Sequence, residues 1–257
     1  MELELKKLDK GAVGKRFGAS ASSYDRAALA QQHIYGVLER MLSRLGRQSF
    51  GRALEIGSGT GAFARYIDDR YEVEQWTLND LSDEMLHYSN FMPRSARPAS
   101  FILGDAETVD LGGGYDLILS ASALQWFHHP ELFLTSLRGR LAPEGVLLVG
   151  TFGCDNLTEV RQLTGRGLSY LEVSAWTSAL GGYEHWELEE EHYPLRFVSP
   201  REVLRHLKHT GVTAVGSGEG FWSVERLRQF EHRYRQLFRD EAGGVRLTYH
   251  PIYMMAW

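Results

Sequence analysis

Between Arg52 and Phe152 the sequence alternates short apolar runs with helical patterns, and this alternation restricts the fold more than any other feature. The apolar runs have the length of buried strands and lie at residues 53–56, 73–79, 99–103, 115–120 and 146–152. Helical spacing separates most of them, at about 60–70, 82–91 and 130–141. Strands that alternate with helices pair in parallel, because a parallel pair needs a crossover connection. We therefore predict a doubly wound α/β sheet with ligands at the carboxyl ends of its strands.

The segments on either side of this core are predicted from their own patterns. Residues 1–50 have apolar positions at helical spacing and form a helical cover. After Phe152, helical stretches are expected near 156–163 and 168–180, and the alternating segment Tyr183–His192 is predicted as strand six.

The end of the chain is expected to hold two basic helices between the last two strands. One helix begins after Ser199, has Pro200 at its first position and runs to Gly211, and the other covers roughly 223–239. Residues 247–257 read as the final strand, in which Pro251 favours an edge or a bulge. We expect a single domain over 1–257, divided into the cover 1–50, a ligand-binding core 51–152, strand six plus helical lid excursions over 153–246, and the strand 247–257.

Composition excludes several classes of protein. No apolar run approaches the roughly 20 residues of a membrane-spanning helix, and the N-terminus has no apolar signal region, so we expect a cytoplasmic protein without membrane contact. The single cysteine, Cys154, leaves no cysteine-based metal site, and no metal is predicted. A net charge of −5 argues against nonspecific nucleic-acid binding. The histidines read as structural or surface residues, with His206 and His209 on one solvated helix face.

The segment from Pro194 to Arg246 departs from the acidic average. It holds ten basic and six acidic residues, a net charge of +4, against −9 for the rest of the chain. Such a contrast indicates a dedicated surface for an acidic partner. The alternative is two helices whose charged faces are simply solvated.

The strongest local motif is Glu55-Ile-Gly-Ser-Gly-Thr-Gly61, which follows the first apolar run and opens a helix. Its glycines allow the backbone to approach a ligand closely. The spacing of Gly57, Gly59 and Ala62 also satisfies the dinucleotide fingerprint, with Asp80 at about the right distance to bind a ribose. A tight turn without any ligand is the other alternative.

Three acidic positions distinguish between possible nucleotide ligands. Glu55 would repel a pyrophosphate but can lie near the ammonium group of a methionyl moiety. Asp80 can accept both ribose hydroxyls, and Asp105 can accept a hydrogen bond from the exocyclic amine of adenine. Taken together, they favour S-adenosylmethionine over a nicotinamide cofactor.

Residues 50–152 resemble the class I S-adenosylmethionine-dependent methyltransferases in the order of these motifs. Segments 17–25, 120–126, 204–211 and 247–249 are more specifically similar to the malonyl-[acyl-carrier protein] O-methyltransferases of biotin synthesis. The chain departs from that pattern at Ser58, Ala121 and Arg246. The resemblance implies a Rossmann-like α/β fold, with a seven-stranded methyltransferase sheet whose last strand is antiparallel and with helical lid insertions.

The resemblance also implies a carboxyl O-methyltransferase that uses S-adenosylmethionine. The acceptor is the free carboxylate of a malonyl thioester on the phosphopantetheine arm of an acyl-carrier protein, or on coenzyme A. A carboxylate is already ionised at neutral pH, so no general base is required. The residues expected to bind the cofactor are Glu55, Gly57, Ser58, Gly59, Gly61, Asp80, Leu81, Met85, Asp105, Ala106 and Ser120.

Three residues are candidates for the catalytic side of the site: Tyr24, which would close over the methyl donor, and Gln125 and Trp126. The candidates for substrate or carrier-protein binding are Arg201, Arg205, Lys208, Arg226 and Tyr249, with Arg201 or Arg205 holding the malonyl carboxylate. Two alternatives stay open: a methyltransferase for a different small acceptor on the same fold, and a noncatalytic module that binds S-adenosylmethionine and a partner.

Overall fold

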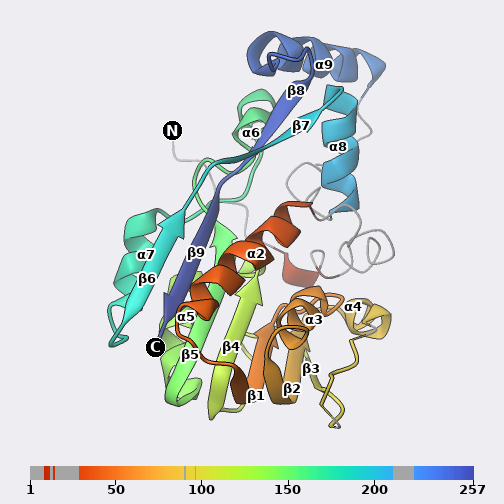
Figure 1. Ribbon diagram of the computed structural model, residues 1–257. Helices are drawn as coiled ribbons and strands as arrows, with labels where there is room; N and C mark the ends of the chain where they lie inside the picture. The colour runs from red at the N-terminus through yellow and green to blue at the C-terminus, as the bar shows by residue number, and fades with distance from the viewer. Residues whose placement is uncertain (1–8, 12–13, 15–28, 90, 96, 211–222) are drawn as a thin grey trace.

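The computed structural model of the chain describes residues 9–11, 14, 29–89, 91–95, 97–210 and 223–257. Its main element is a seven-stranded sheet of order β3-β2-β1-β4-β5-β9-β6 (Figure 1). The strands are β1 (Ser49–Ile56), β2 (Glu72–Asp80), β3 (Ser100–Leu103), β4 (Tyr115–Ala121), β5 (Leu141–Phe152), β6 (Trp186–Glu190) and β9 (Pro251–Ala256). Strands β1 to β5 pair in parallel, whereas β9 runs antiparallel to both β5 and β6. The predicted fold class is confirmed.

Helices cover both faces of this sheet. They are α2 (Leu29–Ser43), α3 (Ala62–Asp68), α4 (Asp83–Tyr88), α5 (Pro130–Leu137) and α7 (Val173–Leu180), with short 3-10 turns at Leu124–Trp126 and Arg138–Arg140. Helix α6 (Thr158–Thr164) instead packs against β8 (Val245–Tyr249) and α9 (Val224–Phe238). One core packs α2 and α3 against Val146 and Leu148 of β5, and the other packs α5 and α7 against Leu147 and Val149. The alternation of side chains along the strand thus supplies both cores.

Helix α2 lies close to the centre of the sheet because of one glycine. A Cβ on Gly150 of β5 would lie 2.6 Å from Cγ2 of Ile34. The predicted helical cover is therefore confirmed for residues 29–43, and its packing distance depends on a residue far away in β5.

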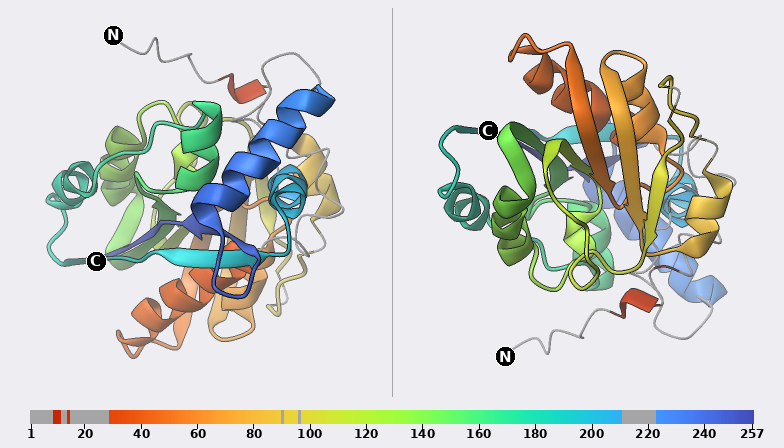
Figure 2. Two further views of the ribbon diagram at one scale, coloured as in Figure 1. Left: turned by 90° about the horizontal axis from the view of Figure 1, so that it is seen from above. Right: turned by 90° about the horizontal axis from the view of Figure 1, so that it is seen from below.

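A second, smaller unit stands at the top of the molecule in Figure 1. Strands β7 (Tyr193–Phe197) and β8 (Val245–Tyr249) pair with each other in a separate two-stranded sheet, which carries α8 (Pro200–His209) and α9 (Val224–Phe238). We call these four elements the lid module. Seen from above in Figure 2, α9 lies across this end of the molecule and α8 is viewed end-on beside it.

The strand predictions at the end of the chain were wrong in one respect. The predicted strand six, Tyr183–His192, is confirmed as β6, but β7, which follows it in the lid module, was not predicted. The final strand, expected to be continuous over 247–257, divides into β8 of the lid module and β9 of the main sheet. Only residues 191–192 separate β6 from β7, and only His250 separates β8 from β9. Strand length alone did not indicate that the chain changes sheets at these points.

Pro251 also differs from its predicted position. It begins β9, which lies between β5 and β6, and is therefore on an interior strand. Proline is tolerated at the first residue of a strand. Its carbonyl still accepts a hydrogen bond from Glu191 N at 3.2 Å.

The lid helices follow their sequence signals. Ser199 Oγ accepts a hydrogen bond from Glu202 N at the start of α8, and Ser223 Oγ caps α9 at Arg226 N. Helix α8 ends at His209, and Gly211, its predicted end, lies outside the described residues. None of the helices in the described ranges has the length and apolar character needed to cross a membrane.

Candidate functional site

An open cavity of about 850 Å³ lies at the carboxyl ends of β1 to β4, where the strand alternation predicted a ligand site. Nine of the residues predicted to bind the cofactor line it: Glu55, Gly57, Ser58, Gly59, Asp80, Leu81, Met85, Asp105 and Ala106. Trp126, predicted on the catalytic side, also lines it. We call this space the donor cavity.

The glycine loop has a shape that other residues would not allow. Gly57 and Gly59 have φ values of +67° and +54°, and a Cβ on Gly57 would lie 2.4 Å from Cβ of Ala123. The backbone of the loop therefore packs directly against Ala123, which also lines the cavity. Gly61 has φ +78° but faces Phe91, and it does not line the cavity.

Glu55 places a carboxyl group in the wall of the donor cavity. It is 2% exposed, and its Oε2 accepts a hydrogen bond from Ala64 N at 3.0 Å. Burial raises the pKa of Glu55 to about 8, with a smaller contribution from the charge of Asp80, while the Ala64 hydrogen bond opposes the shift. At neutral pH this group is mostly protonated, and a bound cation would favour its ionised form.

Asp80 lies at the end of β2, and both of its carboxylate oxygens accept hydrogen bonds from backbone N–H groups. Its Oδ2 accepts from Gly59 N at 2.7 Å and its Oδ1 from Ser82 N at 2.8 Å. Burial raises the pKa of Asp80, and these backbone hydrogen bonds oppose the shift. Each carboxylate oxygen retains a lone pair for a ligand hydroxyl.

Asp105 has a partner that the sequence did not predict. Lys10 Nζ lies 2.7 Å from both carboxylate oxygens of Asp105, and it also pairs with Glu107. The ammonium is 4.9 Å from the ring centroid of Phe127. Lys10 thus lies in the part of the cavity where Asp105 was predicted to bind adenine. Nothing in the sequence near Lys10 connects it with a residue 95 positions away.

Ser120, also predicted to bind the cofactor, lies outside the donor cavity. It is fully buried, and its Oγ donates a hydrogen bond to the carbonyl of Ile56 at 2.9 Å. This bond ties β4 to the end of β1. The hydroxyl therefore fixes the position of Ile56, the residue that precedes the glycine loop.

A second cavity of about 350 Å³ adjoins the first, and Ser122 and Trp126 line both. We call it the acceptor cavity. It brings together three residues predicted for the catalytic or substrate side, namely Gln125, Trp126 and Tyr249. Gln125 Nε2 donates to the carbonyl of Ser122 at 2.6 Å, which fixes the turn after β4. Tyr24 lies outside the described residues.

His206 supports this cavity from the lid module. It was predicted on a solvated face, but it is 8% exposed and its Nε2 lies 2.8 Å from the hydroxyl of Tyr249. Burial lowers the pKa of His206 to about 4, so the ring is neutral at pH 7. The prediction failed because the helix is polar on most sides and β8 covers this position.

Two polar residues of the acceptor cavity were missed from sequence. Ser122 has φ +60°, an uncommon value for a residue with a side chain, and its Oγ is buried with no hydrogen-bond partner in the described part of the chain. Gln31 of α2 is 3% exposed, and its Oε1 likewise lacks a partner there. Buried polar atoms without partners are uncommon, and they mark a place where a ligand can supply the missing bond. Gln31 occupies a helix face that is otherwise apolar, so the pattern gave no functional signal.

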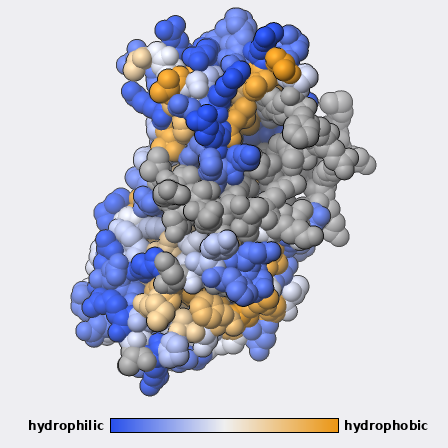
Figure 3. Space-filling view, turned by 90° about the vertical axis from the view of Figure 1, so that its right-hand side faces the viewer, coloured by the Kyte–Doolittle hydropathy of each residue, from blue (hydrophilic) through white to orange (hydrophobic). Residues whose placement is uncertain are grey.

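The predicted basic residues lie on the outside of the lid module. Arg201, Arg205, Lys208 and Arg226 are exposed, and none of them is among the residues that line either cavity. Arg201 Nε pairs with Glu231 of α9. In Figure 3 this end of the molecule is mostly hydrophilic, with separate hydrophobic side chains between the polar ones.

Comparison with known proteins gives consistent results. A methyltransferase domain family matches residues 54–149. The malonyl-[acyl-carrier protein] O-methyltransferase of Porphyromonas gingivalis is 42% identical over 259 aligned residues, covering 99% of this chain and 98% of that protein. The protein of the same name from Haemophilus influenzae is 37% identical over 98% of this chain and 96% of its own length.

Solved structures resemble the fold at lower identity. The YcgJ protein of Bacillus subtilis aligns with a TM-score of 0.60 and 15% identity, covering 87% of this chain and 97% of that one. Phosphoethanolamine N-methyltransferase 2 of Haemonchus contortus, solved with S-adenosylmethionine, aligns with a TM-score of 0.51 and 17% identity, covering 86% of this chain and 52% of that one. At these identities the likeness concerns the fold.

Proposed function

The chain belongs to the malonyl-[acyl-carrier protein] O-methyltransferases, and from this premise we propose how its two cavities carry out the reaction. The enzyme transfers a methyl group from S-adenosylmethionine to the free carboxylate of malonyl-acyl-carrier protein, an early step of biotin synthesis. The observation that carries the proposal is that the two cavities adjoin at Ser122 and Trp126. A donor in one cavity and an acceptor in the other can therefore meet there.

The donor cavity has the groups that the methyl donor requires. Ser58 Oγ lines it, is buried and lacks a hydrogen-bond partner among the described residues, so a bound polar group can complete it. We assign Glu55 to the ammonium side, Asp80 to the ribose hydroxyls and Asp105 to the adenine amine. Lys10 would then hold Asp105 from the other side and close the adenine end of the cavity.

The reaction needs alignment more than proton transfer. When bound, S-adenosylmethionine supplies an electrophilic methyl group whose bond to sulfur breaks as the acceptor oxygen bonds to carbon. The carboxylate acceptor is ionised at pH 7, so the protein need not remove a proton. Orientation of the reacting atoms can contribute about 7 to 11 kcal/mol. We assign Gln125 and Trp126 to this alignment, because they line the acceptor cavity where it meets the donor cavity.

We assign the non-reacting oxygen of the malonyl carboxylate to neutral donors rather than to an arginine. Ser122 Oγ, which is buried without a partner among the described residues, can donate to this oxygen directly, and Gln31 can donate from its Nε2 when its amide turns by 180°, which exchanges that group with the unpartnered Oε1. Neutral hydrogen bonds hold a carboxylate less tightly than a charged bidentate pair does. Its electron density therefore stays available to attack the methyl group, and the sulfonium is the counter-charge.

The carrier protein is assigned to the outer face of the lid module. Phe230, Tyr234 and Phe238 of α9 are buried, whereas four arginines of the same helix are exposed: Arg226, Arg228, Arg233 and Arg235. Carrier proteins are acidic, and a basic face increases the rate of their encounter. Malonyl-coenzyme A has no acidic carrier-protein surface to interact with these arginines, so we expect it to be the poorer substrate.

The test is a single-turnover reaction of the full-length enzyme with S-adenosylmethionine and two acceptors, followed by intact-protein mass spectrometry. Malonyl-carrier protein should gain one methyl group, and fragmentation should place it on the malonyl group of the phosphopantetheine arm, because the product is a methyl ester of the free carboxylate. Acetyl-carrier protein is the matched control, since it lacks the free carboxylate and should gain nothing. Methylation of both acceptors, or of neither, would contradict the proposal.

A further inference from the structure

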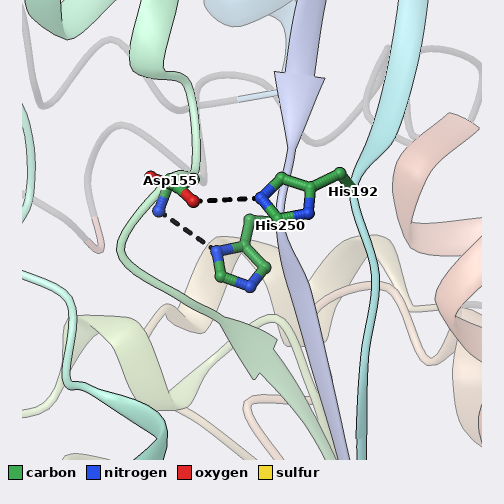
Figure 4. Close-up of side chains that lie close together, drawn as sticks. All are labelled: Asp155, His192 and His250. Atoms are coloured by element: carbon green, nitrogen blue, oxygen red, sulfur yellow. Dashed lines mark hydrogen bonds and ion pairs between the residues drawn. The ribbon is translucent and has the colours of Figure 1, made fainter.

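Three segments meet where the chain passes from the main sheet into the lid module. His192 lies between β6 and β7, His250 lies between β8 and β9, and Asp155 follows the end of β5. Both crossings between the two units therefore carry a histidine. Figure 4 shows the two imidazole rings side by side, with a nitrogen of each directed toward Asp155.

The three side chains form a compact set of metal-ligating atoms. His192 Nε2 lies 3.0 Å from Asp155 Oδ2, and the two rings stack with centroids 4.5 Å apart. One ligand atom from each residue lies within 4.8 Å of the other two, and it is the only such set among the described residues. Tetrahedral zinc ligands at about 2.1 Å from the ion are roughly 3.4 Å apart, so side-chain rotations that bring the ligand atoms closer by about 1 Å would close the set.

The hydrogen bonds of His250 select the tautomer that a metal needs. Its Nδ1 accepts from the backbone N–H of Asp155 at 3.1 Å, and its Nε2 lies 2.9 Å from Glu190 Oε2. The proton is therefore on Nε2, and the lone pair of Nδ1 points toward Asp155. A histidine that ligates a metal through one nitrogen usually donates from the other to a carboxylate. Glu190 already occupies that supporting position.

We propose that Asp155, His192 and His250 form a binding site for a divalent transition-metal ion of the zinc class, which ties the lid module to the main sheet. Two imidazoles and one carboxylate suit zinc, cobalt or nickel rather than magnesium or calcium. Binding requires His250 Nδ1 to exchange the backbone N–H of Asp155 for the ion. Because the side chains of Asp155 and His192 are 61% and 57% exposed, the ion can enter from solvent.

A bound ion would act on the connections between the main sheet and the lid module and not on the methyl-transfer chemistry. Its three ligands come from three segments of the chain, so binding adds a link among them and should raise the thermal stability of the protein and reduce hydrogen exchange in β7 and β8. The ligands must be deprotonated, and affinity should fall as the pH is lowered. The proposal is independent of the acceptor that the enzyme uses.

The test uses untagged, metal-stripped, full-length enzyme titrated with Zn²⁺ by calorimetry and with Co²⁺ by visible absorption. The wild type should bind one ion per chain with a rise in melting temperature. His192→Ala, which removes a ligand from an exposed position, should abolish saturable binding. Glu190→Gln should weaken affinity about tenfold, because it removes only the supporting carboxylate.

Two matched variants identify the ligands. His232→Ala removes an exposed histidine of α9, and Cys154→Ser removes the neighbouring thiol. Both should bind Zn²⁺ as the wild type does. The proposal is overturned by a wild type without saturable binding, by unchanged binding in His192→Ala, or by loss of binding in Cys154→Ser alone.

Discussion

The donor cavity and the acceptor cavity differ in how far apart in the sequence most of their residues lie. The donor cavity is built on consecutive strand ends, and its loop Glu55–Gly61 is a local motif. The acceptor cavity depends on distant residues, such as Gln31 and Ser122, and on a lid histidine that reaches Tyr249. The part that binds the donor common to many methyltransferases is therefore local, and the part that selects the acceptor is assembled by tertiary contacts.

The largest effect is expected in the local part. Glu55→Gln keeps an acceptor for Ala64 N–H but removes the negative charge, so it should weaken binding of S-adenosylmethionine by about 3 kcal/mol, or roughly 100-fold in Kd. Calorimetry measures this directly. Glu189→Gln, an exposed carboxylate on β6, serves as the control and should bind as the wild type does. If Glu55→Gln and Glu189→Gln bound S-adenosylmethionine with equal affinity, the assignment of Glu55 to the ammonium group would be wrong.

The acid stability of the lid should follow His206. The pKa of its folded-state ring, about 4, is below the ordinary value of 6.5, so the unfolded chain binds more protons between these pH values. The stabilisation is therefore complete above pH 6.5 and is lost progressively toward pH 4, by about 3 kcal/mol in total. Urea unfolding at pH 7.5 and 5 measures it.

The control for this prediction is an exposed neighbour on the same helix. His206→Phe should remove most of this pH dependence, whereas His209→Phe should retain it. If both variants kept the dependence of the wild type, the acid sensitivity would belong to another group.

A smaller effect is expected from the acceptor cavity. Gln31→Leu removes the amide that we assign, through its Nε2, to the malonyl carboxylate. A hydrogen bond to a charged group is worth about 1.5 to 3 kcal/mol, so KM for malonyl-carrier protein should rise at least about tenfold. The Kd for S-adenosylmethionine should not change. Steady-state kinetics with saturating donor distinguishes the two, and Gln32→Leu, on the exposed side of α2, is the control. An unchanged KM would exclude Gln31 from acceptor binding.

The smallest effect concerns the outer face of α9. Reversing the charge of Arg226 and Arg233 should lower kcat/KM for malonyl-carrier protein by about threefold to tenfold, and the loss should shrink at high salt. Malonyl-coenzyme A should be used as before. The same reversals at Arg97 and Arg138, which are exposed on the main domain, should leave both substrates unaffected. Equal losses on both substrates would argue against a docking surface.

The sequence predicted the sheet, its order of strands and helices, and most of the donor cavity, because these features depend on local periodicity and on a compact motif. It failed where position depends on distant partners. Lys10 reaches Asp105, His206 is covered by β8, and Ser120 turns to the carbonyl of Ile56. The change of sheet at His250 was also missed, because a strand pattern continues through it without a break.

The central claim is that a buried, mostly protonated Glu55 becomes ionised when the cationic donor binds. Calorimetric titration of S-adenosylmethionine at pH 7, in buffers of different ionisation enthalpy, counts the protons released. With the pKa of free Glu55 at about 8, close to one proton should leave per donor bound, and affinity should rise by about tenfold per pH unit up to pH 8. Binding without proton release, in the wild type as in Glu55→Gln, would contradict the account.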